Sequence, residues 1–458
     1  DAIPLARALP GRSVHVLPSG RPKLKQPHGS CGKARCITSL GFGAVVLSRQ
    51  RQRVALKAEE GQAPILEVRA GRIRRQPPLE EPEEAKTDWF CLEDLDALRS
   101  IVFGNPLNIL LFCVPLSLAS SSSGWGDVAT FSLSFLAIVP LAKLLGEATE
   151  QLACSVGQTL GGLLNATFGN AVEMIISVFA LREGLTEVVK GSLVGSIISN
   201  LLLVLGMCFL FGGLKYKTQS FSATGARTQY SLLLLAVLAL VIPTVVLLTG
   251  ARPEVELLMS RGCAVVLAFL YVCYLIFQLQ THKDLFTAVD GNKASIGLDG
   301  QELREEDVEE EEVSLSPGTA LVLLFLSTAL VAPLSESLTG SVEGVTKTLG
   351  ISDAFVGVIL LPIVGNAAEH LTAVTVATKD KMDLSLGVAL GSSTQIALFV
   401  VPFTVIVGWF LGVPMDLNFK ALDASIMLLT VLIVGSCIND GESNWLEGAA
   451  LIGAYVLI

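Results

Sequence analysis

Long runs of apolar residues without charge are the strongest constraint on how this chain can fold. The clearest extends from Tyr230 to Leu248 and contains no Asp, Glu, Lys or Arg. About 20 such residues form a helix long enough to cross a membrane. The chain is 51% hydrophobic and only 16% charged, whereas a soluble domain is about 25% charged. These features favour a lipid environment and argue against a disordered chain or a disulfide-linked secreted domain.

The sequence predicts an all-α polytopic membrane protein with about eleven transmembrane helices. The spans should be helical because a backbone in lipid must hydrogen-bond within its own segment. Their approximate limits are 101–119, 127–146, 157–181, 192–213, 228–249, 259–280, 317–339, 352–377, 386–411, 419–438 and 445–458. The predicted divisions are a leader and linker (1–95), a peripheral first span (101–119), two five-helix groups (127–280 and 317–458) and a loop (281–316) between the groups.

Charge is concentrated outside the predicted spans. Residues 2–58 hold eleven bases and no acid, a bias typical of organelle transit peptides. Residues 301–313 hold eight acids and one Arg, which predicts a solvated loop that acts as a hinge or attracts cations. Because bases favour the cytoplasmic side, we place the leader and this loop in the cytoplasm, and Lys190 in a loop on the opposite side. The chain stops within an apolar run at Ile458, so we expect the C-terminus to be incomplete.

The sequence contains an internal repeat, with one copy in each predicted five-helix group. GNAVEMI (169–175) and GNAAEHL (365–371) are 196 residues apart. The same offset pairs Gly191 with Gly387 and Ser196 with Ser392. An odd number of spans per group would make the groups inverted repeats, a plan that places transport sites where the repeats meet near the membrane midplane.

The two motif copies carry the candidate site. Asn170 and Glu173, like Asn366 and Glu369, are three residues apart and project from one helical face. A carboxylate within the membrane is costly and is by default a functional candidate. A single buried Glu could be structural, but two equivalent copies favour a cation site. Carboxylate and amide oxygens suit Ca²⁺, and paired carboxylates remote from water also hold protons readily.

Other polar residues in these spans form a candidate secondary path for cations or protons. They are Ser196, Ser392, Gln395, Glu147, Glu150, Glu336 and Glu343. The small residues are equally suited to close helix packing, and acids at the ends of spans are often merely solvated. His370 is expected to face a neighbouring helix.

With these motifs the chain resembles the cation/proton exchanger (CAX) family of Ca²⁺/H⁺ antiporters, within the cation/Ca²⁺ exchanger superfamily. The similarity rests on LAKLLGEATEQLA (141–153), both GN motifs, GSIISNLLLVLG (195–206), the acidic loop and GSSTQIALFVVP (391–402). It implies eleven spans, two inverted repeats and proton-driven removal of cytosolic Ca²⁺ into an acidic compartment. It also implies that Glu173 and Glu369 are the central carboxylates, with both motif asparagines, Gln395 and Ser392 close by.

Several alternatives remain open at this point. The ion could be Mn²⁺ or another divalent cation, or Na⁺ could drive Ca²⁺ exchange; a cation channel is less favoured. Since no catalytic constellation is found, we expect no enzyme activity, no cofactor and no nucleic-acid partner, with Ca²⁺ and H⁺ as transported ions. A vacuolar or other acidic internal membrane is expected, and the basic leader makes a plastid or other organelle membrane the alternative. The oligomeric state is left open.

Overall fold

The computed structural model describes residues 66–69, 72–75, 94–156, 158–282 and 315–458. The chain divides into two units, Asp1–Glu83 and Glu84–Ile458. In the first unit, β1 (Leu66–Arg69) and β2 (Arg72–Arg75) form an antiparallel hairpin with Leu66 opposite Arg75. Most of the predicted leader and the acidic stretch 301–313 lie outside the described residues.

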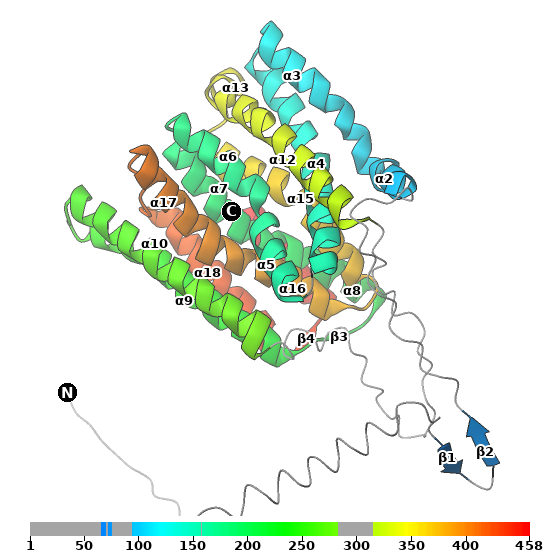
Figure 1. The fold of residues 1–458 in the computed structure, drawn as a ribbon. Coiled ribbons are helices and arrows are strands. Elements are labelled where there is room, and N and C mark those ends of the chain that lie inside the picture. Colours follow the sequence, from blue (N-terminus) through cyan, green and yellow to red (C-terminus); the bar gives the residue numbers. More distant parts are fainter. Residues whose placement is uncertain (1–65, 70–71, 76–93, 157, 283–314) are drawn as a thin grey trace, which may run out of the picture. The chain divides into compact units, whose positions relative to one another are not determined.

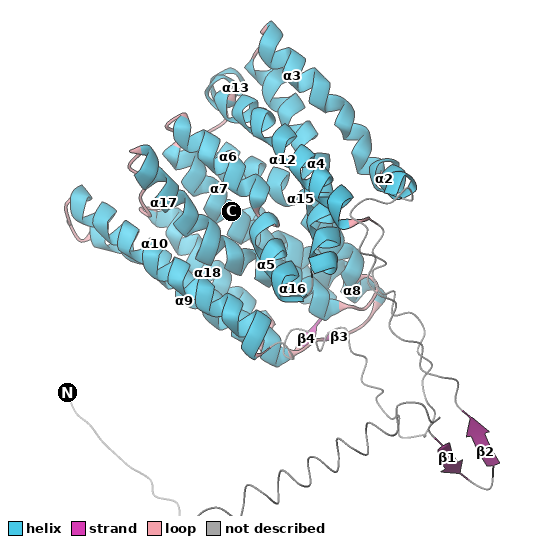
Figure 2. Cartoon of the chain, in the orientation of Figure 1, coloured by secondary structure: helices cyan, strands magenta, loops and turns pink. Residues whose placement is uncertain are grey.

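The second unit consists almost entirely of helices, as Figure 2 shows. In chain order these are α2 (Asp94–Phe103), η1 (Pro106–Phe112), α3 (Cys113–Ser123), α4 (Asp127–Val156), α5 (Gln158–Phe168), α6 (Ala171–Arg182), α7 (Thr186–Ile198), η2 (Ser199–Val204), α8 (Leu205–Lys215), α9 (Ala223–Leu248), α10 (Pro253–Ile276), η3 (Phe277–Thr281), α12 (Pro317–Gly340), α13 (Val342–Leu349), α14 (Asp353–Phe355), η4 (Val356–Leu360), α15 (Leu361–Ala377), α16 (Met382–Gln395), η5 (Ile396–Val400), α17 (Val401–Leu411), α18 (Ala421–Cys437) and α19 (Trp445–Leu457). The short strands β3 (Gln219–Ser220) and β4 (Glu442–Ser443) pair antiparallel. The predicted all-α polytopic fold class is confirmed.

Many of these helices are long enough to cross a membrane. Within the described ranges, eight helical segments meet the length and apolarity that a crossing requires. The pair α5 and α6, bent by 41°, would make a ninth, and α18 and α19 are shorter apolar helices. The number of eleven crossings and the inverted five-helix repeats therefore stay predictions.

Irregular turns occur at matching places in the two halves of the sequence. The π-helical turns η2 and η5 each come a few residues after a Gly-Ser pair, at 195–196 and 391–392. At the 196-residue offset, residues 200–204 of η2 correspond to residues 396–400 of η5. Such turns widen a helix locally and are common at functional sites. The repeat is thus visible in the helix geometry as well as in the residues.

Two hydrophobic clusters form the interior, and α15 connects them. One cluster is built largely from α4, α6 and α12, with α3 packed against α4 (Figure 1). The other is built around α7, α8, α9, α10 and α16. Helix α15 contributes Val364 to the first cluster and Ala373 to the second. The second GN motif, which lies between these two residues, is therefore held between the two clusters.

Candidate cation site

Glu173 is placed by the bend between α5 and α6. The helix stops at Gly169 and Asn170 and restarts at α6, with Glu173 in its first turn. Glu173 is only 8% exposed. Its carboxylate lies directly against the backbone of Gly365 in α15, because a Cβ added at that glycine would fall 2.8 Å from Glu173 Cδ. Glycine at position 365 therefore allows the two motif copies to approach closely.

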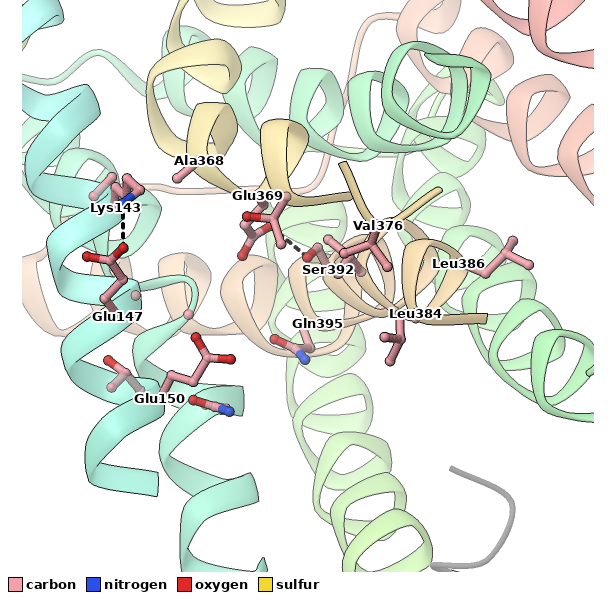
Figure 3. A pocket seen from close by; sticks show the side chains of 18 of the residues that line it. Lys143, Glu147, Glu150, Ala368, Glu369, Val376, Leu384, Leu386, Ser392 and Gln395 are labelled. Atoms are coloured by element: carbon pink, nitrogen blue, oxygen red, sulfur yellow. Dashed lines mark hydrogen bonds and ion pairs between the residues drawn. The ribbon is translucent and has the colours of Figure 1, made fainter. Parts of the chain in front are cut away.

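Glu369 lies in the middle of α15 and is half-buried. Its Oε2 accepts a hydrogen bond of 2.8 Å from Ser392 Oγ in α16, and this bond is drawn in Figure 3. Glu369 lies one helical turn after Gly365, the residue against which the Glu173 carboxylate packs. The structure thus brings the two motif glutamates, 196 residues apart in sequence, to the same region of the fold.

Each motif asparagine donates a hydrogen bond to a side chain at or just after the Gly-Ser pair (195–196 or 391–392) in the other half of the sequence. Asn170 Nδ2 donates to Gln395 Oε1 at 2.7 Å. Asn366 Nδ2 donates to Ser196 Oγ at 3.3 Å and to the carbonyl oxygen of Pro362 at 3.1 Å. Each asparagine therefore ties its own motif helix to a polar side chain contributed by the other half of the sequence.

The two motif glutamates have no basic partner among the residues that the structure describes. Within the described part of the chain, no Lys or Arg forms an ion pair with Glu173 or Glu369. Glu173 Oε2 is buried and finds no hydrogen-bond donor among the described residues. A buried carboxylate in this condition is stable only when a proton or a cation neutralises it. A proton or a cation is therefore the kind of ligand that suits these two carboxylates.

A cavity of about 740 Å³ leads to Glu369 from one end of the helix bundle. Glu369, Ser392 and Gln395 line its inner part, and Glu147 and Glu150 of α4 line it farther out (Figure 3). Its lining also includes residues from the start of α9, the end of the α10–η3 helix and the start of α16, namely Ser222, Gln278 and Asp383. We call this end of the bundle the cavity end.

The secondary candidates fall into two groups. Glu147, Glu150, Ser392 and Gln395 line the cavity, with Glu147 paired to Lys143, and Ser196 contacts Asn366 behind it. Glu336 and Glu343, both exposed, are not among its lining residues.

Glu343 also lies in a separate helix, α13, and pairs with Lys347 at 2.5 Å. The hydrogen bond from Lys347 holds the pKa of Glu343 below its usual value. Glu343 therefore belongs to a solvent-exposed ion pair and does not line the candidate site.

Of two further polar residues, His370 lies as expected from the sequence and Lys190 does not. His370 Nε2 lies 3.2 Å from Asn200 Oδ1, both buried, so His370 does face a neighbouring helical turn, η2. The placement of Lys190 in a loop was wrong: it lies in the second turn of α7, 6% exposed. Its position directly after an apolar pair, Val188–Val189, and before an apolar stretch was the available signal.

Comparison with known proteins decides the family. The family description "Sodium/calcium exchanger protein" matches residues 126–280 and 319–458. The chain belongs to the sodium/calcium exchanger family. As a member of this family it is a transporter and an integral membrane protein, and the resemblance to cation/proton exchangers is confirmed.

Individual relatives of this exchanger cover most of its length. The "Ca(2+)/H(+) antiporter" of Synechocystis sp. is 48% identical over 356 residues, 77% of this chain and 95% of the relative. The "Vacuolar cation/proton exchanger 2" of Oryza sativa subsp. japonica is 42% identical over 374 residues, 80% of this chain and 83% of the relative. The solved structure of native YfkE has 40% identity and a TM-score of 0.65, covering 77% of this chain and 97% of YfkE.

Proposed function

We propose that this exchanger moves Ca²⁺ out of the cytosol in exchange for H⁺, by alternating access at a midplane site formed by Glu173 and Glu369. The names of its relatives support the two ions, since the Synechocystis relative is a Ca²⁺/H⁺ antiporter and the rice relative is a cation/proton exchanger. Residues Asn170, Asn366, Ser392 and Gln395 would complete the oxygen-rich surroundings of the two carboxylates.

One observation carries this proposal: two motif glutamates lie close together, and among the described residues neither has a basic partner and Glu173 Oε2 has no hydrogen-bond donor. A Ca²⁺ ion, which takes six to eight oxygen ligands, would neutralise both carboxylates at once. Protons would neutralise the same two groups and thereby remove the charge that attracts Ca²⁺. Occupation by Ca²⁺ and occupation by protons then exclude each other, which is the requirement for exchange at a single site.

The cavity supports the cytosolic direction of Ca²⁺ entry. The α10–η3 helix ends and α12 begins on either side of the acidic loop, which we place in the cytoplasm from its charge and that of the leader. Gln278 near the end of that helix lines the cavity. Ca²⁺ would enter from the cytosol past Glu147, which is paired with Lys143, and past Glu150. The names of vacuolar relatives support an acidic internal membrane; a plastid membrane is the alternative that the basic leader suggests.

Uptake of ⁴⁵Ca²⁺ into vesicles with an imposed acidic interior tests the proposal. We expect uptake that disappears when the pH gradient is collapsed, because protons leaving the vesicle drive Ca²⁺ inward. Glu173→Gln and Glu369→Gln should each reduce it at least tenfold, since each removes a charge that Ca²⁺ needs. Glu343→Gln is the matched control, because Glu343 is an exposed glutamate outside the cavity lining.

The same vesicles identify the ion. Competition by Mn²⁺ and replacement of the pH gradient by a Na⁺ gradient distinguish Ca²⁺/H⁺ exchange from its two closest alternatives. Uptake that persists without a pH gradient, or that survives both Glu→Gln substitutions, would contradict exchange at these glutamates. Uptake without any counter-ion dependence would indicate a channel instead.

A further inference from the structure

The connection between α17 and α18, residues 412–420, is unusually well anchored. It has no regular secondary structure after Gly412. Nevertheless Met415, Leu417 and Phe419 are almost completely buried. We call residues 412–420 the anchored segment. It belongs to the second predicted repeat, whereas its polar contacts described below come from helices of the first.

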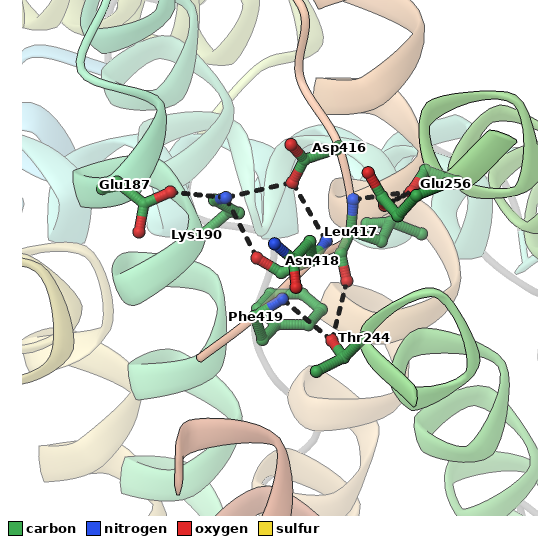
Figure 4. A network of polar contacts seen from close by, with 9 residues as sticks. Glu187, Lys190, Thr244, Glu256, Asp416, Leu417, Asn418 and Phe419 are labelled. Atoms are coloured by element: carbon green, nitrogen blue, oxygen red, sulfur yellow. Dashed lines mark hydrogen bonds and ion pairs between the residues drawn. The ribbon is translucent and has the colours of Figure 1, made fainter. Parts of the chain in front are cut away.

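Three helices hold the backbone of the anchored segment. Lys190 Nζ of α7 donates to the carbonyl oxygen of Asn418 at 3.0 Å and pairs with Asp416 Oδ1 at 3.0 Å. The Leu417 amide donates to Ser260 Oγ of α10 at 2.8 Å, and the Phe419 amide donates to Thr244 Oγ1 of α9 at 3.0 Å. Figure 4 shows these contacts converging on the segment.

These contacts lie at the end of the bundle opposite to the cavity. In α9, Thr244 is 22 residues beyond Ser222, which lines the cavity at the N-terminal end of that helix. At 1.5 Å per residue the two positions are about 33 Å apart. In the α10–η3 helix, Ser260 and the cavity-lining Gln278 are likewise near opposite ends. The anchored segment therefore lies at the far end, opposite to the end at which the cavity opens.

Lys190 is not explained by packing stability. The Lys190 side chain is 7% exposed, whereas those of Asp416 and Glu187 are 27% and 57% exposed. Desolvation of Lys190 offsets much of the attraction to these acids, so the contact is weak evidence for stability. At the 196-residue offset the equivalent residue is Leu386, which is also buried. The repeated fold thus accepts an apolar side chain at this position, and the charge at position 190 has a purpose specific to the far end.

We propose that Lys190 is a positioning residue that keeps the far end closed by docking the anchored segment through Asp416 and Asn418. Release of this segment accompanies opening of the far end in the exchange cycle, so the inference rests on the proposed alternating access. A cavity of about 190 Å³ lies beside the contact and is lined by Glu187, Lys190, Asp353 and Asp423 among others. Opening there would expose a polar surface to the departing ion.

A cysteine reporter tests the docking directly and without transport. In the full chain, Leu417→Cys places a thiol at a position that is 0% exposed. We expect a water-soluble maleimide to label it slowly, and about tenfold faster when Lys190→Met is added, because this substitution leaves the Asp416 carboxylate and the Asn418 carbonyl oxygen without their charged donor. The chain without the reporter gives the background of its native cysteines, and Lys190→Arg should restore slow labelling.

Glu187→Gln is the matched control. Glu187 pairs with Lys190 at 2.5 Å but is more than half exposed and lies outside the anchored segment. It should leave the labelling rate unchanged. If Lys190→Met does not accelerate labelling, or if Glu187→Gln accelerates it equally, the proposal is overturned.

A reversible cross-link tests whether release is required for transport. Cysteines at positions 190 and 416, joined by a short bifunctional methanethiosulfonate, should abolish ⁴⁵Ca²⁺ uptake, and reduction should restore it. Each single-cysteine variant treated in the same way is the control. Unchanged uptake by the cross-linked pair would overturn the requirement for release. Failure of the proposed antiport is distinguishable, because it would abolish uptake by the unsubstituted chain and leave the labelling result intact.

Discussion

At the scale of single residues, the two motif glutamates differ in the groups that surround them. Gly365 provides no side chain where the Glu173 carboxylate lies. Among the described residues, no donor reaches Glu173 Oε2. By contrast, Glu369 has a hydroxyl donor in Ser392 and faces the cavity. The two motif glutamates are equivalent in sequence but differ in surroundings, since Glu369 lines the cavity and Glu173 is not among its lining residues.

Ser392 and Ser393 offer a matched pair for testing the contact with Glu369. Ser392 donates to the carboxylate, whereas Ser393 donates to the carbonyl oxygen of Ala389 within its own helix. Ser392→Ala should raise the Ca²⁺ concentration for half-maximal uptake about tenfold, because a hydrogen bond to a charged group is worth about 1.5–3 kcal/mol and about 1.4 kcal/mol is a factor of ten. Ser393→Ala should leave it within about twofold. Equal effects would show that the Ser392 contact is not specific to the site.

The glutamates could be predicted from the sequence, but their partners could not. Duplication makes Glu173 and Glu369 stand out, because chance rarely repeats a carboxylate within two apolar segments. The contact between Asn170 and Gln395 spans 225 residues and departs from the repeat, in which Gln395 corresponds to Ser199. Nothing in the local pattern identifies such a pair. It follows from how the helices cross, which is a property of the folded chain.

At the scale of elements, helices α7 and α16 are equivalent in sequence but not in packing. At Gly195 in α7, a Cβ would fall 2.7 Å from Pro362 Cγ and still closer to the carbonyl oxygen of Val358. At the equivalent Gly391 in α16, nothing lies within 4 Å. Helix α7 is therefore pressed against η4 and α15, whereas α16 leaves room beside the cavity. This difference follows from a molecule open at one end only.

Alanine substitutions at the two glycines should therefore differ in effect. Gly195→Ala should lower the free energy of unfolding by about 1–3 kcal/mol, the usual cost of forcing extra atoms into a packed core. Gly391→Ala should be neutral or slightly stabilising, because alanine favours a helix by about 1 kcal/mol over glycine. Thermal unfolding of the purified chain in detergent measures both. A larger loss for Gly391→Ala would contradict the packing difference.

The sequence predicted the helices more accurately than the bend and the π-helical turns that interrupt them. Apolar runs located the helices because lipid leaves the backbone few alternatives to a helix. The 41° bend at residues 169–170 separates α5 from α6, within a run that was predicted as one span. Gly169 marked that position, but glycine is also tolerated within straight helices, so the residue alone did not predict a break. The π-helical turns had no recognised signal.

At the scale of the whole molecule, the cavity and the anchored segment lie at opposite ends of the bundle. The cavity reaches Glu369 from one end. At the other, the anchored segment is held by α7, α9 and α10. The sequence predicted the helical plan of a transporter, while the central site stays a prediction. It did not predict at which end the cavity opens, because that depends on how the helices pack and not on which residues they contain.

Access to the site from the cavity end is the last prediction, and it tests the molecule as a whole. Ala368 lines the cavity next to Glu369, whereas Leu384 lines it from the first turn of α16. A cysteine at either position should react with a water-soluble maleimide, since both side chains face the cavity (Figure 3). Ca²⁺ should slow labelling of Ala368→Cys several-fold, because the bound ion and the closing helices would cover that position, and should affect Leu384→Cys less.

Adding Glu369→Gln identifies the cause of protection. If Ca²⁺ protects Ala368→Cys by binding between the glutamates, protection should disappear in the Glu369→Gln background while labelling without Ca²⁺ stays fast. Protection that persists in that background would mean that Ca²⁺ binds elsewhere, for example near Glu147 and Glu150 in the outer cavity. Equal protection of both cysteines would point to closure of the entrance alone. Only selective, Glu369-dependent protection of the inner position fits a cation that reaches the buried glutamate pair through this cavity.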